Sequence, residues 1–216
     1  MNEQGTDLKI PVGNVIVEGN LNLPAQARGI VIFAHGSGSG RFSPRNQYVA
    51  KEFNKAGIGT LLFDLLTSEE EEEDMVTAEY RFDIELLAQR LIGATEWLKK
   101  DPNTKTLALS YFGASTGAAA ALIAAAKLPK DIATVVSRGG RPDLAAEYLS
   151  EVVAPTLLLV GGLDAEVIEL NRQAMAQMTA EKKLVIIPGA SHLFEEPGKL
   201  QEVARISTDW FLRYLK

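Results

Sequence analysis

At the start of the chain, apolar residues alternate with polar ones. The alternating stretches run from Leu8 to Val12, from Val15 to Val17 and from Leu21 to Leu23, and they are separated by Gly13-Asn14 and Gly19-Asn20. Alternation with a period of two residues is typical of strands that expose one face to water. The pattern predicts an antiparallel edge to a sheet, with a turn at each Gly-Asn pair.

The later apolar segments are short and continuous, as expected for strands that are covered on both faces. These runs occupy residues 29–34, 58–63, 106–109, 132–136, 156–160 and 184–187. Helical patterns alternate with them after Ser43-Pro44, over about 81–100, 116–127, 143–150 and 165–179, and at the end of the chain, where Val203, Ile206, Trp210 and Tyr214 share one stripe. Strands that alternate with helices predict an α/β fold, here one domain over residues 1–216, with a mostly parallel twisted sheet and helices on both faces.

Charge and composition exclude several classes of function. The net charge is −6 and the longest basic run is a Lys-Lys pair, which disfavours a nucleic-acid partner. The chain has no cysteine, so disulfides and thiolate chemistry are excluded. Its N-terminus lacks the apolar region of a signal peptide, and no apolar run approaches the roughly 18 residues of a membrane span. We expect a cytoplasmic protein with no membrane partner, metal or cofactor; its oligomeric state is not fixed by the sequence, and a homodimer stays open.

One biased segment interrupts this pattern. Residues 68–74 contain five consecutive glutamates, Glu69 to Glu73, followed by Asp74. A run of like charges predicts a solvated surface loop. A selector against anionic ligands or a cation site is the alternative.

The segment Gly113-Ala114-Ser115-Thr116-Gly117 has the G-x-S-x-G pattern of a nucleophile elbow, in which a strand turns sharply into a helix and presents a serine at its tip. Glycines two residues before and after the serine allow the close backbone approach that such a turn needs. A buried strand precedes the segment, and an alanine-rich helical stretch follows it. The context predicts Ser115 as a nucleophile, with a plain glycine-rich turn as the alternative.

A serine hydroxyl needs a neighbouring base to act as a nucleophile. Of the two histidines, His192 directly follows the last predicted strand, where it would lie at the same sheet edge as Ser115. His35 follows an inner strand, and we expect it to hold its loop by hydrogen bonds.

An acid should orient this base. Asp164 follows the preceding strand and completes the order Ser, Asp, His that α/β hydrolases use. Glu166 and Glu169 are rivals within the following helix.

Acyl transfer also requires hydrogen-bond donors for the oxyanion that develops in the transition state. The backbone N–H groups of Thr116 and Ser37 are the expected donors. Gly36 and its neighbouring glycines would let the Ser37 loop approach a substrate. The same glycines resemble a phosphate-binding loop, but no G-K-[ST] sequence follows them.

With these motifs in place, the chain resembles the α/β-hydrolase superfamily over nearly its whole length. More narrowly, it is similar to the group related to dienelactone hydrolases, including hydrolase domains fused to phosphoribosyltransferases. Residues 35–39, 43–46, 113–117 and 137–142 carry this likeness. True dienelactone hydrolases have a cysteine nucleophile where this chain has Ser115. The resemblance implies a site without a cap domain, open to small acyl groups, where Arg138 and Arg141 either meet a substrate carboxylate or make surface contacts.

The sequence therefore favours a serine hydrolase that cleaves small carboxylic esters. An acyltransferase, thioesterase or perhydrolase would use the same residues and differ only in the acyl donor or acceptor. A binding domain that keeps the fold without catalysis is the alternative from another class.

Overall fold

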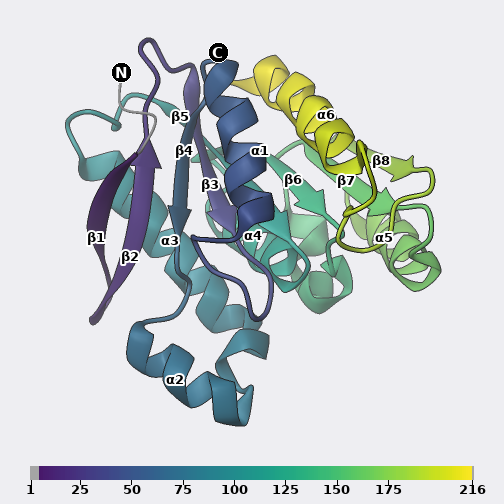
Figure 1. Ribbon diagram of the computed structural model, residues 1–216, viewed down its shortest axis with the longest axis horizontal. Coiled ribbons are helices and arrows are strands. Elements are labelled where there is room, and N and C mark those ends of the chain that lie inside the picture. Colours follow the sequence, from purple (N-terminus) through teal and green to yellow (C-terminus); the bar gives the residue numbers. More distant parts are fainter. Residues whose placement is uncertain (1–4, 216) are drawn as a thin grey trace.

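One eight-stranded sheet organises the molecule, which we describe from a computed structural model that covers residues 5–215. The strand order is β1-β2-β4-β3-β5-β6-β7-β8 (Figure 1). The strands β3 to β8 pair in parallel, whereas β1 pairs antiparallel with β2, and β2 antiparallel with β4. Their bounds are β1 Thr6–Val12, β2 Val15–Asn22, β3 Gly29–Ala34, β4 Gly59–Phe63, β5 Ala108–Ala114, β6 Ile132–Arg138, β7 Thr156–Gly161 and β8 Lys182–Ile187. The predicted parallel sheet with an antiparallel edge is confirmed.

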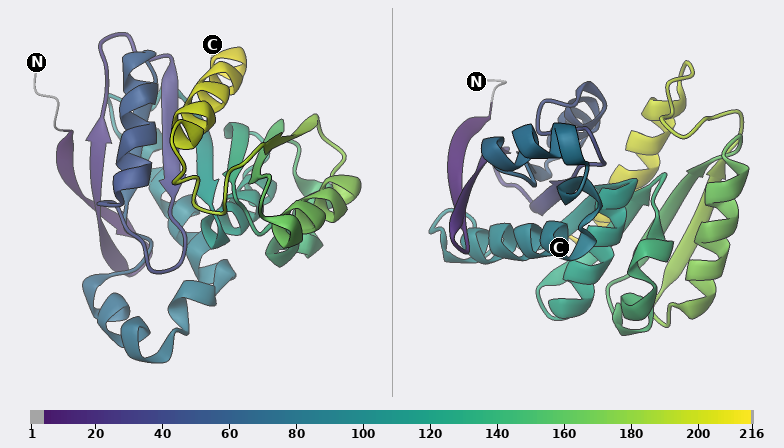
Figure 2. Two further views of the ribbon diagram at one scale, coloured as in Figure 1. Left: turned by 45° about the vertical axis from the view of Figure 1, so that its right-hand side comes forward. Right: turned by 90° about the horizontal axis from the view of Figure 1, so that it is seen from below.

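Helices cover both faces of this sheet, as the alternating pattern predicts. Helices α1 (Pro44–Lys55) and α6 (Lys199–Tyr214) lie together on one face. Helices α3 (Ile84–Lys100), α4 (Thr116–Lys127) and α5 (Ala165–Gln177), with the 3-10 segment η2 (Pro142–Glu151), cover the other face (Figures 1 and 2). Ser43 caps α1, because its side chain accepts the N–H of Asn46.

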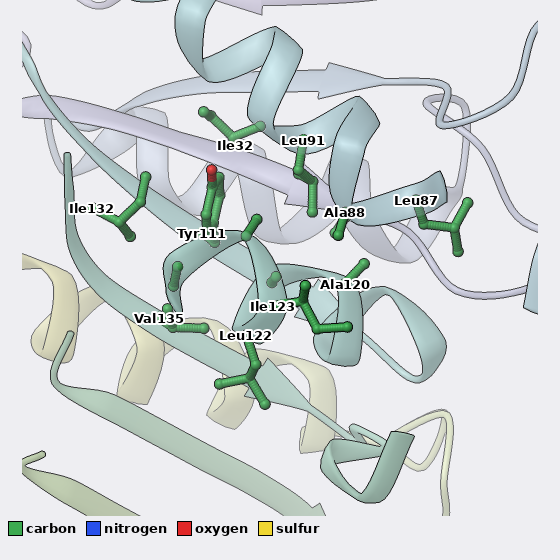
Figure 3. Close-up of a cluster of buried hydrophobic side chains, with 14 of the residues drawn as sticks. Ile32, Leu87, Ala88, Leu91, Tyr111, Ala120, Leu122, Ile123, Ile132 and Val135 are labelled. Atoms are coloured by element: carbon green, nitrogen blue, oxygen red, sulfur yellow. The ribbon is translucent and has the colours of Figure 1, made fainter. Parts of the chain in front are cut away.

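The core forms two clusters, one on each side of the sheet. The larger cluster lies under α3 and α4, where Tyr111 of β5 packs among the aliphatic side chains of both helices (Figure 3). The alanine-rich sequence of α4 lets this helix pack closely, and residues 116–126 are all buried. The smaller cluster contains Phe33, Phe53, Phe112 and Phe211 under α1 and α6. A packed core on both faces fixes the carboxyl ends of the parallel strands, where the predicted site residues lie.

Two sequence expectations are wrong in this part of the fold. Gly19-Asn20 is not a turn, since both residues pair inside the continuous strand β2. A Cβ atom on Gly19 would lie 2.8 Å from Ile10 Cδ1, so the glycine serves close side-chain packing rather than chain reversal. The segment expected as an acidic loop is helix α2 (Ser68–Thr77), followed by the short 3-10 segment η1 (Tyr80–Phe82).

Local hydrogen bonds explain why α2 forms despite its like charges. Thr67 accepts the N–H of Glu70, and the Glu70 carboxylate accepts the N–H of Thr67, which is a capping box. Glutamates in the first turn also face the positive end of the helix dipole. Helix α2 lies beyond the carboxyl ends of β3 and β4, outside the two helical layers (Figure 1).

Within the described residues, none of the helices has the length and apolar character needed to cross a membrane.

Candidate active site

Ser115 lies at the tip of a sharp turn between β5 and α4. Its backbone has φ 51° and ψ −121°, a conformation that costs a residue other than glycine roughly 1–3 kcal/mol. The Ser115 N–H donates to the Arg138 carbonyl at 3.2 Å, and the Ser115 carbonyl accepts from the N–H groups of Ala118 and Arg141, both at 3.1 Å. Hydrogen bonds on both sides of the peptide therefore hold the turn in its strained form.

The glycines of the motif are required by close backbone contacts. A Cβ atom on Gly113 would lie 2.4 Å from Ala118 Cα, and one on Gly117 would lie 2.3 Å from the Ala34 carbonyl oxygen. One on Gly36 would lie 3.1 Å from Ser115 Cβ, so the loop after β3 passes directly beside the serine. A side chain at Gly113 or Gly117 would therefore collide with backbone atoms, and one at Gly36 would crowd Ser115.

His192 and Asp164 form a close pair at the same sheet edge. His192 follows β8 and Asp164 follows β7, and His192 Nδ1 lies 2.6 Å from Asp164 Oδ2. An ionised carboxylate can only accept, so Nδ1 carries the proton of this hydrogen bond. In a neutral imidazole, Nε2 then keeps a free lone pair. Such a pair holds the ring in the tautomer that a general base needs.

The rival acids lie elsewhere. Glu169 accepts a hydrogen bond from Gln173 on α5, and among the described residues neither Glu166 nor Glu169 forms a hydrogen bond or ion pair with His192. Between the three candidates, the geometry pairs the histidine with Asp164.

The two expected oxyanion donors belong to the loop after β3 and to the first turn of α4, which are hydrogen-bonded to each other. The Ser37 N–H donates to Thr116 Oγ1 at 3.1 Å, and Ser37 Oγ lies 3.0 Å from the same hydroxyl. Ser37 Oγ also donates to the Arg81 carbonyl at 3.4 Å. The Ser37 N–H is therefore engaged by the Thr116 hydroxyl, a contact that the sequence motif does not predict.

His35 ties the loops after β3 and β4 together. Its Nε2 accepts the N–H of Leu65 at 3.0 Å, so Nδ1 carries the proton and donates to the Gly36 carbonyl at 3.1 Å. Burial lowers the pKa of His35, although the Gly36 carbonyl and the charges of Asp64 and Glu71 act in the opposite direction. His35 is thus a buried imidazole whose two ring nitrogens are both hydrogen-bonded to backbone groups.

A cavity of about 460 Å³ opens beside the Ser37 loop. Its wall includes the apolar residues Leu65, Leu66, Met75 and Leu87, together with residues of the loop after β3. Helix α2 and η1 close one side of the cavity. Residues 5–215 form no separate cap domain, but the short α2–η1 segment covers part of this cavity.

An ion pair fastens this α2–η1 segment. Arg81 donates through its backbone N–H and its Nε to the carboxylate of buried Asp74, at 3.0 and 2.6 Å, and its Nη2 donates to the Asp74 carbonyl. Burial alone would raise the pKa of Asp74, but the hydrogen bonds from Arg81 outweigh it and lower that pKa overall. Arg81 therefore connects α2 to the Ser37 loop through its own carbonyl.

The two arginines after β6 differ in environment. Arg141 forms two hydrogen bonds to Asp143, at 2.9 and 2.7 Å, in a surface contact. Arg138 is buried over the Phe112 ring, and its Nη1 has no hydrogen-bond partner among the described residues. Burial, with a contribution from Arg45, lowers the pKa of Arg138 to about 10.

A model of the dienelactone hydrolase family matches residues 17–215. The chain belongs to this family. The chain is similar to a dienelactone hydrolase from Anabaena variabilis whose structure is solved. The two sequences are 57% identical, the match covers 99% of both chains, and the TM-score is 0.97. Family membership establishes the protein as a hydrolase with the α/β-hydrolase fold.

Two further proteins are similar to this member of the dienelactone hydrolase family. One matches it over only part of its own length, and the other shares only the fold. A Mycobacterium tuberculosis protein provisionally named a phosphoribosyl transferase is 54% identical over 209 residues, which is 97% of this chain but only 46% of that protein. The chain thus spans about half the length of this relative. A Xanthomonas campestris α/β serine hydrolase without a lid shares the fold at 20% identity, with 99% and 96% of the two chains covered and a TM-score of 0.78.

The sequence motifs missed the residues of the α2–η1 side of the cavity. The sequence Thr67-Ser68-Glu69-Glu70 has the T-x-x-E spacing of a capping box, which could have predicted helix α2. The Asp74–Arg81 pair and the Thr116 hydroxyl contact had no such signal, because both depend on the packing of distant segments.

Proposed function

We propose that this hydrolase cleaves carboxylic esters through an acyl-enzyme on Ser115. The observation that carries the proposal is the His192–Asp164 pair, 2.6 Å apart, at the sheet edge where strained Ser115 follows β5. A serine, a histidine with a free Nε2 and an orienting carboxylate are the groups that acyl transfer requires.

In the proposed mechanism, Ser115 Oγ attacks the ester carbonyl while His192 Nε2 takes the hydroxyl proton. The carbonyl oxygen becomes an oxyanion that the N–H groups of Thr116 and Ser37 stabilise, each donor lowering the barrier by roughly 3 kcal/mol. The C–O bond to the leaving alcohol then breaks, and His192 returns the proton to it. Water repeats these steps on the acyl-enzyme, which releases the acid and restores Ser115.

The Thr116 hydroxyl has a further place in this mechanism. It accepts the Ser37 N–H at 3.1 Å, so this expected oxyanion donor already has a hydrogen-bond acceptor. When the oxyanion forms, the N–H turns to this stronger, charged acceptor. The Thr116 hydroxyl keeps its 3.0 Å contact with Ser37 Oγ, which holds the loop in place.

A carboxylic ester is favoured over the alternative acyl compounds by one comparison. The relative with 57% identity is named a dienelactone hydrolase, and a lactone is a cyclic ester. Thioester hydrolysis or acyl transfer to another acceptor would use the same residues. The phosphoribosyl transferase name belongs to a protein of which this chain covers 46%, so that activity is not proposed here.

Replacement of the nucleophile tests the proposal. We expect Ser115→Ala to lower kcat for p-nitrophenyl acetate at least about a thousandfold, because no other group can form the acyl-enzyme. Ser150→Ala, at an exposed serine far along the chain, should retain wild-type turnover. Thermal melts of all three proteins control for folding. Turnover by folded Ser115→Ala above one tenth of wild type would refute the nucleophile assignment.

A further inference from the structure

The cavity beside the Ser37 loop lies on one definite side of Ser115. It is built by the loops after β3 and β4 and by helices α2 and α3. In the strand order, β5 separates β4-β3 from β6-β7-β8. Asp164 and His192 follow β7 and β8, so the cavity and the proposed base flank the serine from opposite sides.

This arrangement assigns the two halves of an ester. The leaving alcohol must receive a proton from His192, so it has to lie on the β6–β8 side of Ser115. The oxyanion takes the position between Thr116 and Ser37. The acyl substituent is then directed toward the β3–β4 side. There the loop with Gly36 and Ser37 lies beside Ser115 and also forms part of the cavity wall.

The lining of the cavity suits an apolar group. Leu65 and Leu87 are buried at its floor, and Met75, 70% exposed, stands at its opening. The volume of about 460 Å³ falls in the range of small-molecule sites, roughly 300–1,000 Å³. An aliphatic or aromatic acyl group would cover these apolar surfaces.

Two carboxylates also line the cavity, and they differ in their partners. Asp74 is neutralised by Arg81 at 2.6 Å. The exposed carboxylate of Glu71 forms no hydrogen bond or ion pair with any described residue, yet it is close enough for its charge to act on buried His35. One carboxylate at the exposed rim of the cavity therefore lacks an ion-pair partner among the described residues.

We propose that this cavity binds the acyl group of the substrate and that Glu71 selects neutral or cationic acyl groups over those with a carboxylate. The inference rests on the proposed ester hydrolysis at Ser115. It assigns the acyl side of the site and gives one residue of the acidic segment a role in specificity.

The position of the acyl group is tested with esters of graded length. Met75→Trp should obstruct the opening and lower the hexanoate-to-acetate ratio of kcat/KM for the p-nitrophenyl esters roughly tenfold. Val76→Trp is the matched control, because Val76 lies on the same helix, is 88% exposed and does not line the cavity. Alkyl acetates with alcohols of increasing length should be insensitive to both changes. A loss at Met75→Trp confined to long alcohols would reverse the assignment and overturn it.

The charge selection is tested by two esters of equal length. The p-nitrophenyl monoester of adipic acid carries a carboxylate where the hexanoate ester ends in a methyl group. Glu71→Lys should raise the adipate-to-hexanoate ratio of kcat/KM about tenfold at low salt, and less at high salt, where charges are screened. Glu72→Lys makes the same change in net charge next to Glu71 but outside the cavity lining, and should shift the ratio less than about twofold.

The outcomes separate this inference from the proposed function. Equal shifts at Glu71→Lys and Glu72→Lys would refute the selection by Glu71 while ester hydrolysis stands. Absence of turnover for every ester, with Ser115 unreactive, would refute the proposed function and this inference with it.

Discussion

At the scale of single residues, the motif around Ser115 could be predicted from the sequence, because its glycines are needed where two backbone segments approach closely. Gly113 and Gly117 face backbone atoms that leave no room for a Cβ atom. His192 and Asp164 could be placed because each lies in the loop that follows a predicted strand of the parallel sheet. The contact of the Thr116 hydroxyl with Ser37 could not be predicted, because the hydrophobic pattern does not show which way a side chain in the first helical turn points. Burial of Arg138 was equally unreadable, as charged residues usually remain exposed.

The role of the acid is a prediction at this scale. Asp164→Asn should lower kcat about 10⁴-fold, because an amide at this position favours the wrong tautomer of His192. Glu166→Gln, in the following helix, should stay within about threefold of wild type. Steady-state kinetics on p-nitrophenyl acetate would decide between them. A small loss at Asp164→Asn beside a large one at Glu166→Gln would move the role to Glu166.

At the scale of elements, the strands and most helices follow from periodicity, and the exceptions have local causes. The five glutamates predict a loop by their repulsion, but the Thr67–Glu70 capping box and the helix dipole stabilise helix α2 instead. The predicted helix over 81–100 begins at Ile84, with Asp83 as its N-cap, after the separate segment η1. Gly19-Asn20 resembles a turn in composition, yet the register with β1 and β4 continues through it.

The link between the loops after β3 and β4 predicts a pH dependence of stability. Because burial lowers the pKa of His35, the folded state binds its proton more weakly than the unfolded state does. The contribution of neutral His35 to the free energy of unfolding is therefore fully present above the ordinary histidine pKa of about 6.5. This contribution is lost as the pH falls toward the lower pKa of the folded state.

Urea unfolding of the wild type and of His35→Gln between pH 8 and pH 5 measures this contribution. The variant should be less stable by about 1–3 kcal/mol at pH 8, because the buried N–H of Leu65 loses its imidazole acceptor. Its stability should also depend less on pH between 7 and 5. Identical pH dependence in the two proteins would contradict the assignment of the titration to His35. The variant His192→Gln, at a partly exposed histidine, serves as the comparison.

At the scale of the whole molecule, the alternating strands and helices were sufficient to predict a parallel sheet covered on both faces. The sequence could not show that the short α2–η1 segment stands over the carboxyl ends of β3 and β4, because its position depends on the Asp74–Arg81 pair and on contacts with α3. That segment completes a cavity on one side of Ser115, and the His192–Asp164 pair lies on the other. Ser115, after the central strand β5, thus lies between the proposed acyl and leaving-group sides of the reaction.

The central claim is that Ser115 is an activated nucleophile, and covalent labelling with a fluorophosphonate tests it most directly. The reagent should add to the folded protein with one-to-one stoichiometry, and peptide mass spectrometry should locate the adduct on Ser115. Labelling should be abolished in Ser115→Ala and slowed at least about a hundredfold in His192→Ala, because the hydroxyl then lacks its base. An unlabelled wild-type protein, or an adduct on another serine that persists in Ser115→Ala, would contradict the account.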